Sequence, residues 1–205
     1  MPKKELPRKV IRQELMWPTP YWHTMIWHFM RSETRVTFND DFTNYILNER
    51  DNNKSVIKSN RGGWQSELVS SNNENYKPLI DEIVEFVNHL PISQKSKSFS
   101  IPQLWANVNT KGNWNTIHQH GTYHLSGTYY VKVPENCGRL CFRDPRPGAI
   151  GNLYLNKNFD EGEVRNVKLV EGLLMVWPNY LDHFVEPSQT DEERISISFD
   201  IVYNT

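Results

Sequence analysis

The second half of the chain, residues 99–205, consists of short apolar segments separated by turn-forming residues, and this pattern restricts the possible folds most strongly. The segments are LWANVN, HLSGTYYVKV, GRLCF, VKLV, GLLMVWP and ERISISFDIV, with Gly, Pro and Asn between them. No stretch of helical periodicity separates one segment from the next. Short strands joined in this way predict an antiparallel β-sandwich or jelly roll.

The first half has a different pattern. Residues 15–29 are aromatic and apolar with two prolines, which suits an extended strand at a sheet edge. A helix is expected to start at a cap formed by Asn39 or Asp40. Residues 76–90 carry apolar side chains at helical spacing and precede Pro91, so they predict an amphipathic helix.

Together the two halves predict one domain over residues 1–205. In this interpretation residues 1–98 form an N-terminal strand and helical layer, and residues 99–205 form the β core. The chain is long enough for one core, and 38% of its residues are hydrophobic. The expected class is therefore mostly β with a helical N-terminal layer.

Charge and cysteine content limit the partners and the compartment. The net charge is −1, so duplex nucleic acid is not an expected partner. The longest apolar runs are too short to cross a bilayer, and no secretory signal is evident. Only two cysteines occur, Cys137 and Cys141, which we expect to be free buried thiols. These observations predict a cytoplasmic protein without a membrane segment.

Three of the seven histidines lie within residues 118–124. His118 and His120 are two positions apart, so on a strand their side chains point to the same face. His183 follows the apolar strand GLLMVWP. A loop after a core strand lies at the rim of a barrel, where ligand-binding sites form. Imidazole is a ligand of iron, zinc, copper and nickel. These three histidines could therefore bind one metal ion. The alternative is that His118 and His120 are ordinary strand residues and His183 an exposed loop residue, without a role in metal binding.

The segment RISISFDI, residues 194–201, alternates strictly between apolar and polar side chains. If its polar face lines a barrel interior, Arg194 and Ser196 lie there side by side. A guanidinium beside a hydroxyl is well shaped to bind a carboxylate through two parallel charge-assisted hydrogen bonds. A strand with one solvated face gives the same periodicity and stays open as an alternative.

These motifs together resemble the iron(II)- and 2-oxoglutarate-dependent oxygenases, in particular the prolyl 4-hydroxylase-like branch and a set of oxygenases of unassigned substrate from bacteria and phages. The similarity extends over most of the chain. The stretches that carry it are WPTP, GGWQS, LWANVN, GNWNTIHQH, LSGTYYVKVPENCGRL, FRDPRP, EGLLMVWPNYLDHFVEP and RISISFDI. The resemblance implies a double-stranded β-helix, a cupin-like jelly roll, with Fe(II) bound at its open end. For a phage protein, the compartment would be the host cytoplasm.

The resemblance also implies roles for individual residues. His118 and His183 would bind the metal, and Arg194, assisted by Ser196, would bind the distal carboxylate of 2-oxoglutarate. Tyr130 occupies the place of a tyrosine that contacts the same carboxylate in related hydroxylases. The remaining candidates for binding 2-oxoglutarate are Asn107, Asn109 and Ser126.

The sequence departs from the family pattern at the second metal ligand. The family has an acidic residue there, and this chain has His120. We expect His120 to bind the metal directly. A nearby carboxylate, Asp144 or Asp182, or an additional water molecule are the alternatives. His124 is expected in the surroundings of the site or at the surface.

The predicted activity is that of a dioxygenase that consumes 2-oxoglutarate and dioxygen, releases succinate and carbon dioxide, and hydroxylates a peptide side chain or a small metabolite. Two alternatives remain from the sequence. One is a three-histidine cupin-type dioxygenase that does not use 2-oxoglutarate. The other is a catalytically silent metal-binding structural module.

Overall fold

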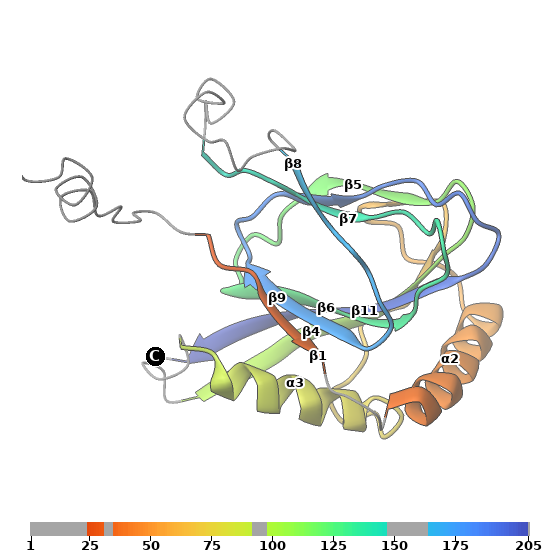
Figure 1. The fold of residues 1–205 in the computed structure, drawn as a ribbon. Coiled ribbons are helices and arrows are strands. Elements are labelled where there is room, and N and C mark those ends of the chain that lie inside the picture. The colour runs from red at the N-terminus through yellow and green to blue at the C-terminus, as the bar shows by residue number, and fades with distance from the viewer. Residues whose placement is uncertain (1–23, 31–34, 92–97, 147–163, 205) are drawn as a thin grey trace, which may run out of the picture.

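The computed structural model describes residues 24–30, 35–91, 98–146 and 164–204. Its strands form two antiparallel sheets that face each other (Figure 1). The larger sheet has the order β1 (Trp27–Met30), β9 (Leu173–Pro178), β6 (Leu125–Lys132), β11 (Arg194–Asn204), β4 (Ser98–Asn109) and β3 (Trp64–Gln65). The smaller sheet has the order β2 (Asn60–Arg61), β5 (Trp114–His118), β10 (His183–Val185), β7 (Leu140–Arg143) and β8 (Val164–Val167). The predicted mostly-β jelly roll is confirmed.

Two helices, α2 (Arg35–Asn52) and α3 (Lys77–His89), cover the outer face of the larger sheet (Figure 1). Their buried apolar side chains, including Ile46 and Ile83, pack in one cluster with Leu104 and Ile197 of the sheet. The helix predicted over residues 76–90 is confirmed within one residue at each end. The helical layer therefore buries one face of the larger sheet and leaves its other face to the space between the sheets.

The expected start of the first helix was wrong. Helix α2 begins at Arg35, and Asn39 lies inside it rather than at its cap. Asn39 is buried, and its amide oxygen accepts a hydrogen bond from the hydroxyl of Tyr129 on β6 at 2.8 Å. A tertiary contact with the sheet thus accounts for a polar residue that resembled a helix cap in the sequence.

Two strand predictions need adjustment. Strand β1 lies at a sheet edge as expected, but it covers only Trp27–Met30, and residues 15–23 lie outside the described residues. The predicted strand VKLV, residues 167–170, overlaps the observed strand β8 only at Val167, which pairs with Leu140 on β7.

Strand β11 lies between β6 and β4, and its alternation has the predicted consequence. The apolar residues Ile195, Ile197, Phe199 and Ile201 are fully buried against the helical layer. The even-numbered residues between Arg194 and Asp200 all line a pocket between the sheets. Within the described residues, no helix is long and apolar enough to cross a membrane.

Candidate metal centre

Three imidazoles converge at one end of the space between the sheets. His118 ends β5 and His183 begins β10, and the two residues are directly opposite each other in that antiparallel pair. His120 lies just beyond β5, with its ring centroid 5.2 Å from that of His118 and 5.0 Å from that of His183. One nitrogen from each ring lies within 4.8 Å of the others, a separation that allows all three to bind one ion.

Each of the three rings is held through its Nδ1 atom. His118 Nδ1 lies 2.7 Å from the main-chain oxygen of Thr116, and His183 Nδ1 lies 2.9 Å from that of Leu181. A carbonyl oxygen can only accept, so both Nδ1 atoms donate and both Nε2 atoms keep a free lone pair. Such a contact fixes the tautomer and the orientation of a metal-binding histidine.

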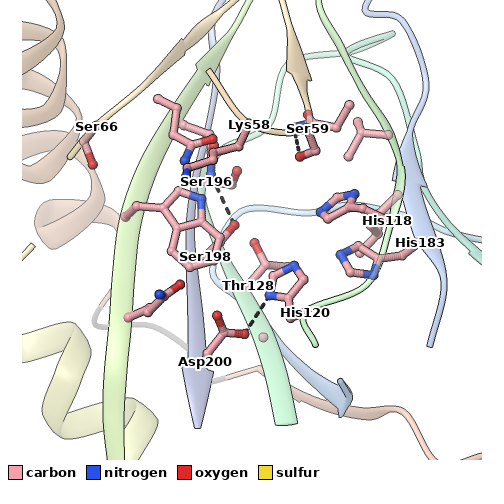
Figure 2. A pocket seen from close by; sticks show the side chains of 18 of the residues that line it. Lys58, Ser59, Ser66, His118, His120, Thr128, His183, Ser196, Ser198 and Asp200 are labelled. Atoms are coloured by element: carbon pink, nitrogen blue, oxygen red, sulfur yellow. Dashed lines mark hydrogen bonds and ion pairs between the residues drawn. The ribbon is translucent and has the colours of Figure 1, made fainter. Parts of the chain in front are cut away.

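The third ring, His120, has a carboxylate as its partner. Its Nδ1 lies 2.6 Å from Oδ1 of Asp200 (Figure 2). The same carboxylate oxygen also accepts from the hydroxyl of Ser126 at 2.8 Å. Asp200 is 1% exposed. The sequence places Asp200 on the same strand face as Arg194, and the even spacing was the only signal for its position. Its contact with His120 could not be read from the sequence.

Burial favours the neutral form of two of the imidazoles, those of His118 and His183. Desolvation, followed by repulsion from His118, lowers the pKa of His183 to about 3. Desolvation also lowers the pKa of His118 below its usual value. Neutral imidazole is the form that binds a metal ion, so these two ligands are available without losing a proton at neutral pH.

The other residues considered for the metal lie elsewhere. Asp144 binds Arg146 with its carboxylate, and neither Asp144 nor Asp182 belongs to the cluster of metal-binding groups. His124 is exposed, and its Nδ1 accepts from the main-chain amide of Tyr203 at 2.9 Å. The geometry thus favours His120 over either carboxylate as the third group.

The histidines open into a pocket of about 690 Å³ between the two sheets (Figure 2). Three neighbouring strands of the larger sheet form one wall of the pocket. Ser196 on β11 pairs with Asn107 on β4 and with Tyr130 on β6, so the three residues lie side by side across the sheet. All three of these residues line the pocket. Of the other candidates, Asn109 is buried outside the lining, and Ser126 is directed to Asp200.

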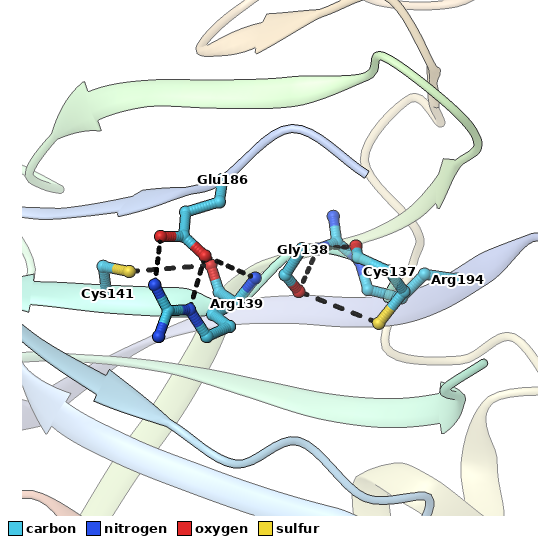
Figure 3. Close-up of polar contacts among 6 residues, drawn as sticks. All are labelled: Cys137, Gly138, Arg139, Cys141, Glu186 and Arg194. Atoms are coloured by element: carbon cyan, nitrogen blue, oxygen red, sulfur yellow. Dashed lines mark hydrogen bonds and ion pairs between the residues drawn. The ribbon is translucent and has the colours of Figure 1, made fainter. Parts of the chain in front are cut away.

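Arg194 provides a buried cation in the same pocket. Its Nη1 donates to the main-chain oxygens of Cys137 at 3.2 Å and Gly138 at 3.4 Å, while its buried Nε has no partner (Figure 3). No carboxylate among the described residues forms an ion pair with this guanidinium, which is 3% exposed. Burying an unpaired charge is costly, so the arrangement favours an anionic ligand. Desolvation correspondingly lowers the pKa of Arg194.

Tyr130 faces the same end of the pocket as a neutral hydroxyl. Burial is the main reason that its pKa is raised above the usual range, even though Arg194 nearby acts in the opposite direction. A neutral phenol can donate a hydrogen bond to a carboxylate. Cys137 and Cys141 are both free and buried, as expected.

The donors present fit both groups that the sequence resemblance implies. Three Nε2 atoms on one side of a pocket can hold an iron ion and leave its other positions open. The unpartnered Nε of Arg194 and the neutral hydroxyl of Tyr130 suit the far carboxylate of 2-oxoglutarate.

Comparisons with known proteins agree with this interpretation. Residues 103–200 match the family model described as "Putative 2OG-Fe(II) oxygenase". The match includes all three histidines, Arg194 and Asp200. No curated protein matches the sequence.

Solved structures with the same fold have low sequence identity. A prolyl-4-hydroxylase from Pseudomonas putida is 13% identical, with 89% of this chain and 94% of that chain covered and a TM-score of 0.61. The α-ketoglutarate-dependent epimerase SnoN from nogalamycin biosynthesis is 13% identical, with 89% and 77% covered and a TM-score of 0.68. HygX from Streptomyces hygroscopicus, solved with nickel and 2-oxoglutarate bound, is 10% identical, with 98% and 88% covered and a TM-score of 0.63.

Proposed function

We propose that this chain, whose residues 103–200 match the family model of 2OG-Fe(II) oxygenases, hydroxylates a small polar molecule at the expense of 2-oxoglutarate and dioxygen. Its cofactors are Fe(II) and 2-oxoglutarate. The observation that carries the proposal is the presence, in one pocket, of three convergent imidazoles and a buried arginine that has no ion-pair partner among the described residues.

Each residue has a separate role in this proposal. His118, His120 and His183 hold the iron through Nε2. Arg194, Ser196 and Tyr130 bind and orient the distal carboxylate of 2-oxoglutarate, and Asn107 lies on the wall beside them. Bound Fe(II) and 2-oxoglutarate would supply the oxidising chemistry, and the chain supplies their binding and orientation.

The part of the pocket formed by residues 56–68 and strand β4 supports the choice of substrate. Its walls carry neutral hydrogen-bonding side chains together with one lysine and one glutamate, and among the apolar groups are Val56, Leu68 and the indole of Trp105. Apart from Asn107, the polar lining residues of this part are Lys58, Ser59, Gln65, Ser66, Glu67 and Gln103. Hydroxyl and amide groups of a sugar-like or nucleoside-like molecule would find partners there. An apolar prolyl ring would leave most of these groups unpaired.

The test of the reaction is oxygen-dependent formation of succinate from 2-oxoglutarate by the Fe(II)-loaded protein. We expect slow succinate formation without substrate and its loss in Arg194→Ala, while that variant still binds one Fe(II). Wild-type protein that binds Fe(II) but forms no succinate, with or without any screened compound, would contradict the proposal.

The substrate class is tested by stimulation of that basal rate. A panel of sugars and nucleosides is compared with proline-containing peptides of similar concentration. Stimulation by members of the first group and not by the peptides is expected. The reverse result would place the substrate among peptides.

The three-histidine set specifically favours one alternative, a cupin-type dioxygenase that does not use 2-oxoglutarate. In that enzyme Arg194 would have only a structural role. Oxygen consumption by the Fe(II) protein that does not require 2-oxoglutarate, and that survives a stably folded Arg194→Lys substitution, would favour this second function.

A further inference from the structure

The His120–Asp200 pair differs from the other two imidazole contacts in its charge. His118 and His183 donate to main-chain oxygens, which are neutral. His120 alone among the three has a carboxylate, Asp200, at 2.6 Å from its Nδ1. His120 also occupies the motif position where the resemblance implies an acidic ligand. The departure from the ligand pattern therefore coincides with a carboxylate, Asp200, that binds one ring of the cluster.

We propose that Asp200 supplies the iron site, through the ring of His120, with the negative charge that a directly bound carboxylate supplies in the usual two-histidine facial triad. This inference rests on the proposed function and deepens it. Asp200 is a positioning residue that acts on the metal through another residue, and it does not itself touch the ion.

The environment of Asp200 makes its charge effective. The side chain is 1% exposed, so water and salt screen it weakly. Among the described residues, no lysine or arginine forms an ion pair with it, and its contacts are His120 and the Ser126 hydroxyl. A buried carboxylate is costly without a positive partner, and a metal ion on the far nitrogen of His120 would provide one.

Strand pairing holds this carboxylate in place. Asp200 lies on β11 opposite Ser126 of β6 and Gln103 of β4, in the middle of the larger sheet. The main-chain amide of His120 donates to the main-chain oxygen of Asn179 at 3.1 Å, which fixes the backbone that carries the ring. Both partners of the pair are therefore fixed before a metal binds, as a supporting contact in a metal site requires.

The physical effect should appear in the metal itself. An imidazole that donates to a carboxylate is a stronger electron donor than one that donates to a carbonyl. The added negative charge stabilises Fe(III) more than Fe(II), so it lowers the midpoint potential of the bound ion. A residue that merely positioned His120 would not affect the potential through its charge.

The experiment compares three variants of the full chain. Asp200→Asn keeps an oxygen that can accept from His120 but removes the charge. Ser126→Ala keeps the charge and removes only the supporting hydroxyl. The double variant His120→Asp with Asp200→Asn moves the carboxylate into the ligand position and leaves a neutral amide behind it.

The measurements are Co(II) and Fe(II) affinity by titration and the midpoint potential of the bound iron, neither of which needs substrate. Asp200→Asn should weaken metal binding about 10- to 100-fold and raise the midpoint potential. Ser126→Ala should leave the potential near that of the wild type. The double variant should return the potential towards the wild-type value.

Wild-type affinity and potential in Asp200→Asn would overturn the inference and leave the proposed function intact. Wild-type protein that binds no Fe(II) would overturn both. If Asp200→Asn does not fold by itself, the double variant decides, because it keeps one carboxylate at the metal site. A midpoint potential far above that of the wild type in the double variant would contradict the role assigned to the charge.

Discussion

Arg194 on β11 donates from Nη1 to the main-chain oxygen of Cys137 at 3.2 Å, so the guanidinium is anchored along one edge. Its Nε remains buried without a partner. The two residues lie 57 positions apart in the chain, and their contact orients the cation within the pocket. A rigid fork with a free edge can bind a carboxylate with two parallel hydrogen bonds, which a lysine ammonium cannot do.

Arg194→Lys should therefore weaken 2-oxoglutarate binding while leaving metal binding unchanged. Loss of a hydrogen bond to a charged group costs about 1.5–3 kcal/mol, equivalent to roughly a 10- to 150-fold higher KM for 2-oxoglutarate. The matched control is Cys137→Ala, because Arg194 contacts the main chain of that residue and not its thiol. A KM that is unchanged in Arg194→Lys would argue against the assigned carboxylate site.

Metal binding should stabilise the folded chain. A ligand at 100 times its Kd adds about 2.7 kcal/mol, and for a chain of this size that raises Tm by roughly 5–10 °C. We expect Co(II) or Mn(II) to produce this shift in the wild type and not in His183→Ala, as measured by thermal melting. His124→Ala, at an exposed histidine outside the cluster, should keep the full shift.

The stability of the metal-free protein should decrease as the pH falls below about 6.5. Desolvation lowers the pKa of His183 to about 3, against an ordinary value of 6.5, so the unfolded chain binds this proton more readily than the folded chain. The stabilising effect is complete above pH 6.5 and declines by at most about 1.4 kcal/mol per unit between pH 6.5 and 3.

Urea unfolding in the presence of a chelator at pH 7 and pH 5 measures this slope. His183→Gln, which cannot take up the proton, should show a shallower slope than the wild type. Equal slopes would mean that other groups, and not His183, determine the acid sensitivity.

Gly127 on β6 should tolerate no side chain. A Cβ atom there would lie 2.3 Å from the ring of Phe199 and 2.7 Å from the main-chain oxygen of Met175 on the neighbouring strand β9. The main chain cannot retreat without breaking the sheet, so Gly127→Ala should cost about 1–3 kcal/mol in unfolding free energy. Gly121→Ala is the control, because open space surrounds its Cβ and only its positive φ of 56° opposes the substitution. Denaturant unfolding should show the larger loss for Gly127→Ala.

Much of this architecture could be predicted because local patterns carried it. The alternation in residues 194–201 indicates a two-sided strand, and β11 has that character over its whole buried length. The helix ending before Pro91 follows the same local rules. The spacing of His118 and His120, with His183 after an apolar strand, was enough to suggest a cluster, because strand geometry fixes the directions of their side chains.

The features that escaped prediction depend on contacts between distant segments. Asn39 resembles a helix cap in the sequence, but in the structure it accepts a hydrogen bond from Tyr129, which is 90 residues away. The pairing of Asp200 with His120 spans 80 residues, and nothing local distinguishes Asp200 from the other polar residues of its strand. Periodicity determines the face on which a side chain lies but not the residue it meets across the pocket.

Trp105 allows the substrate side of the pocket to be tested separately from the cosubstrate side. Its indole lines the pocket, and its ring centroid lies 5.7 Å from that of His120, on β4 opposite Ser198. Arg194 lies four residue pairs further along the same strand pairing. A flat aromatic surface beside the metal site is suited to hold a substrate by stacking while the neighbouring polar groups orient it.

We therefore expect Trp105→Ala to abolish stimulation by the compound that accelerates the wild type, with little change in the basal succinate rate or in the KM for 2-oxoglutarate. Trp114→Ala, at an indole that is 38% exposed and outside the pocket lining, should retain the stimulation. If Trp105→Ala instead raised the KM for 2-oxoglutarate and kept the stimulation, the assignment of this side of the pocket to the substrate would be wrong.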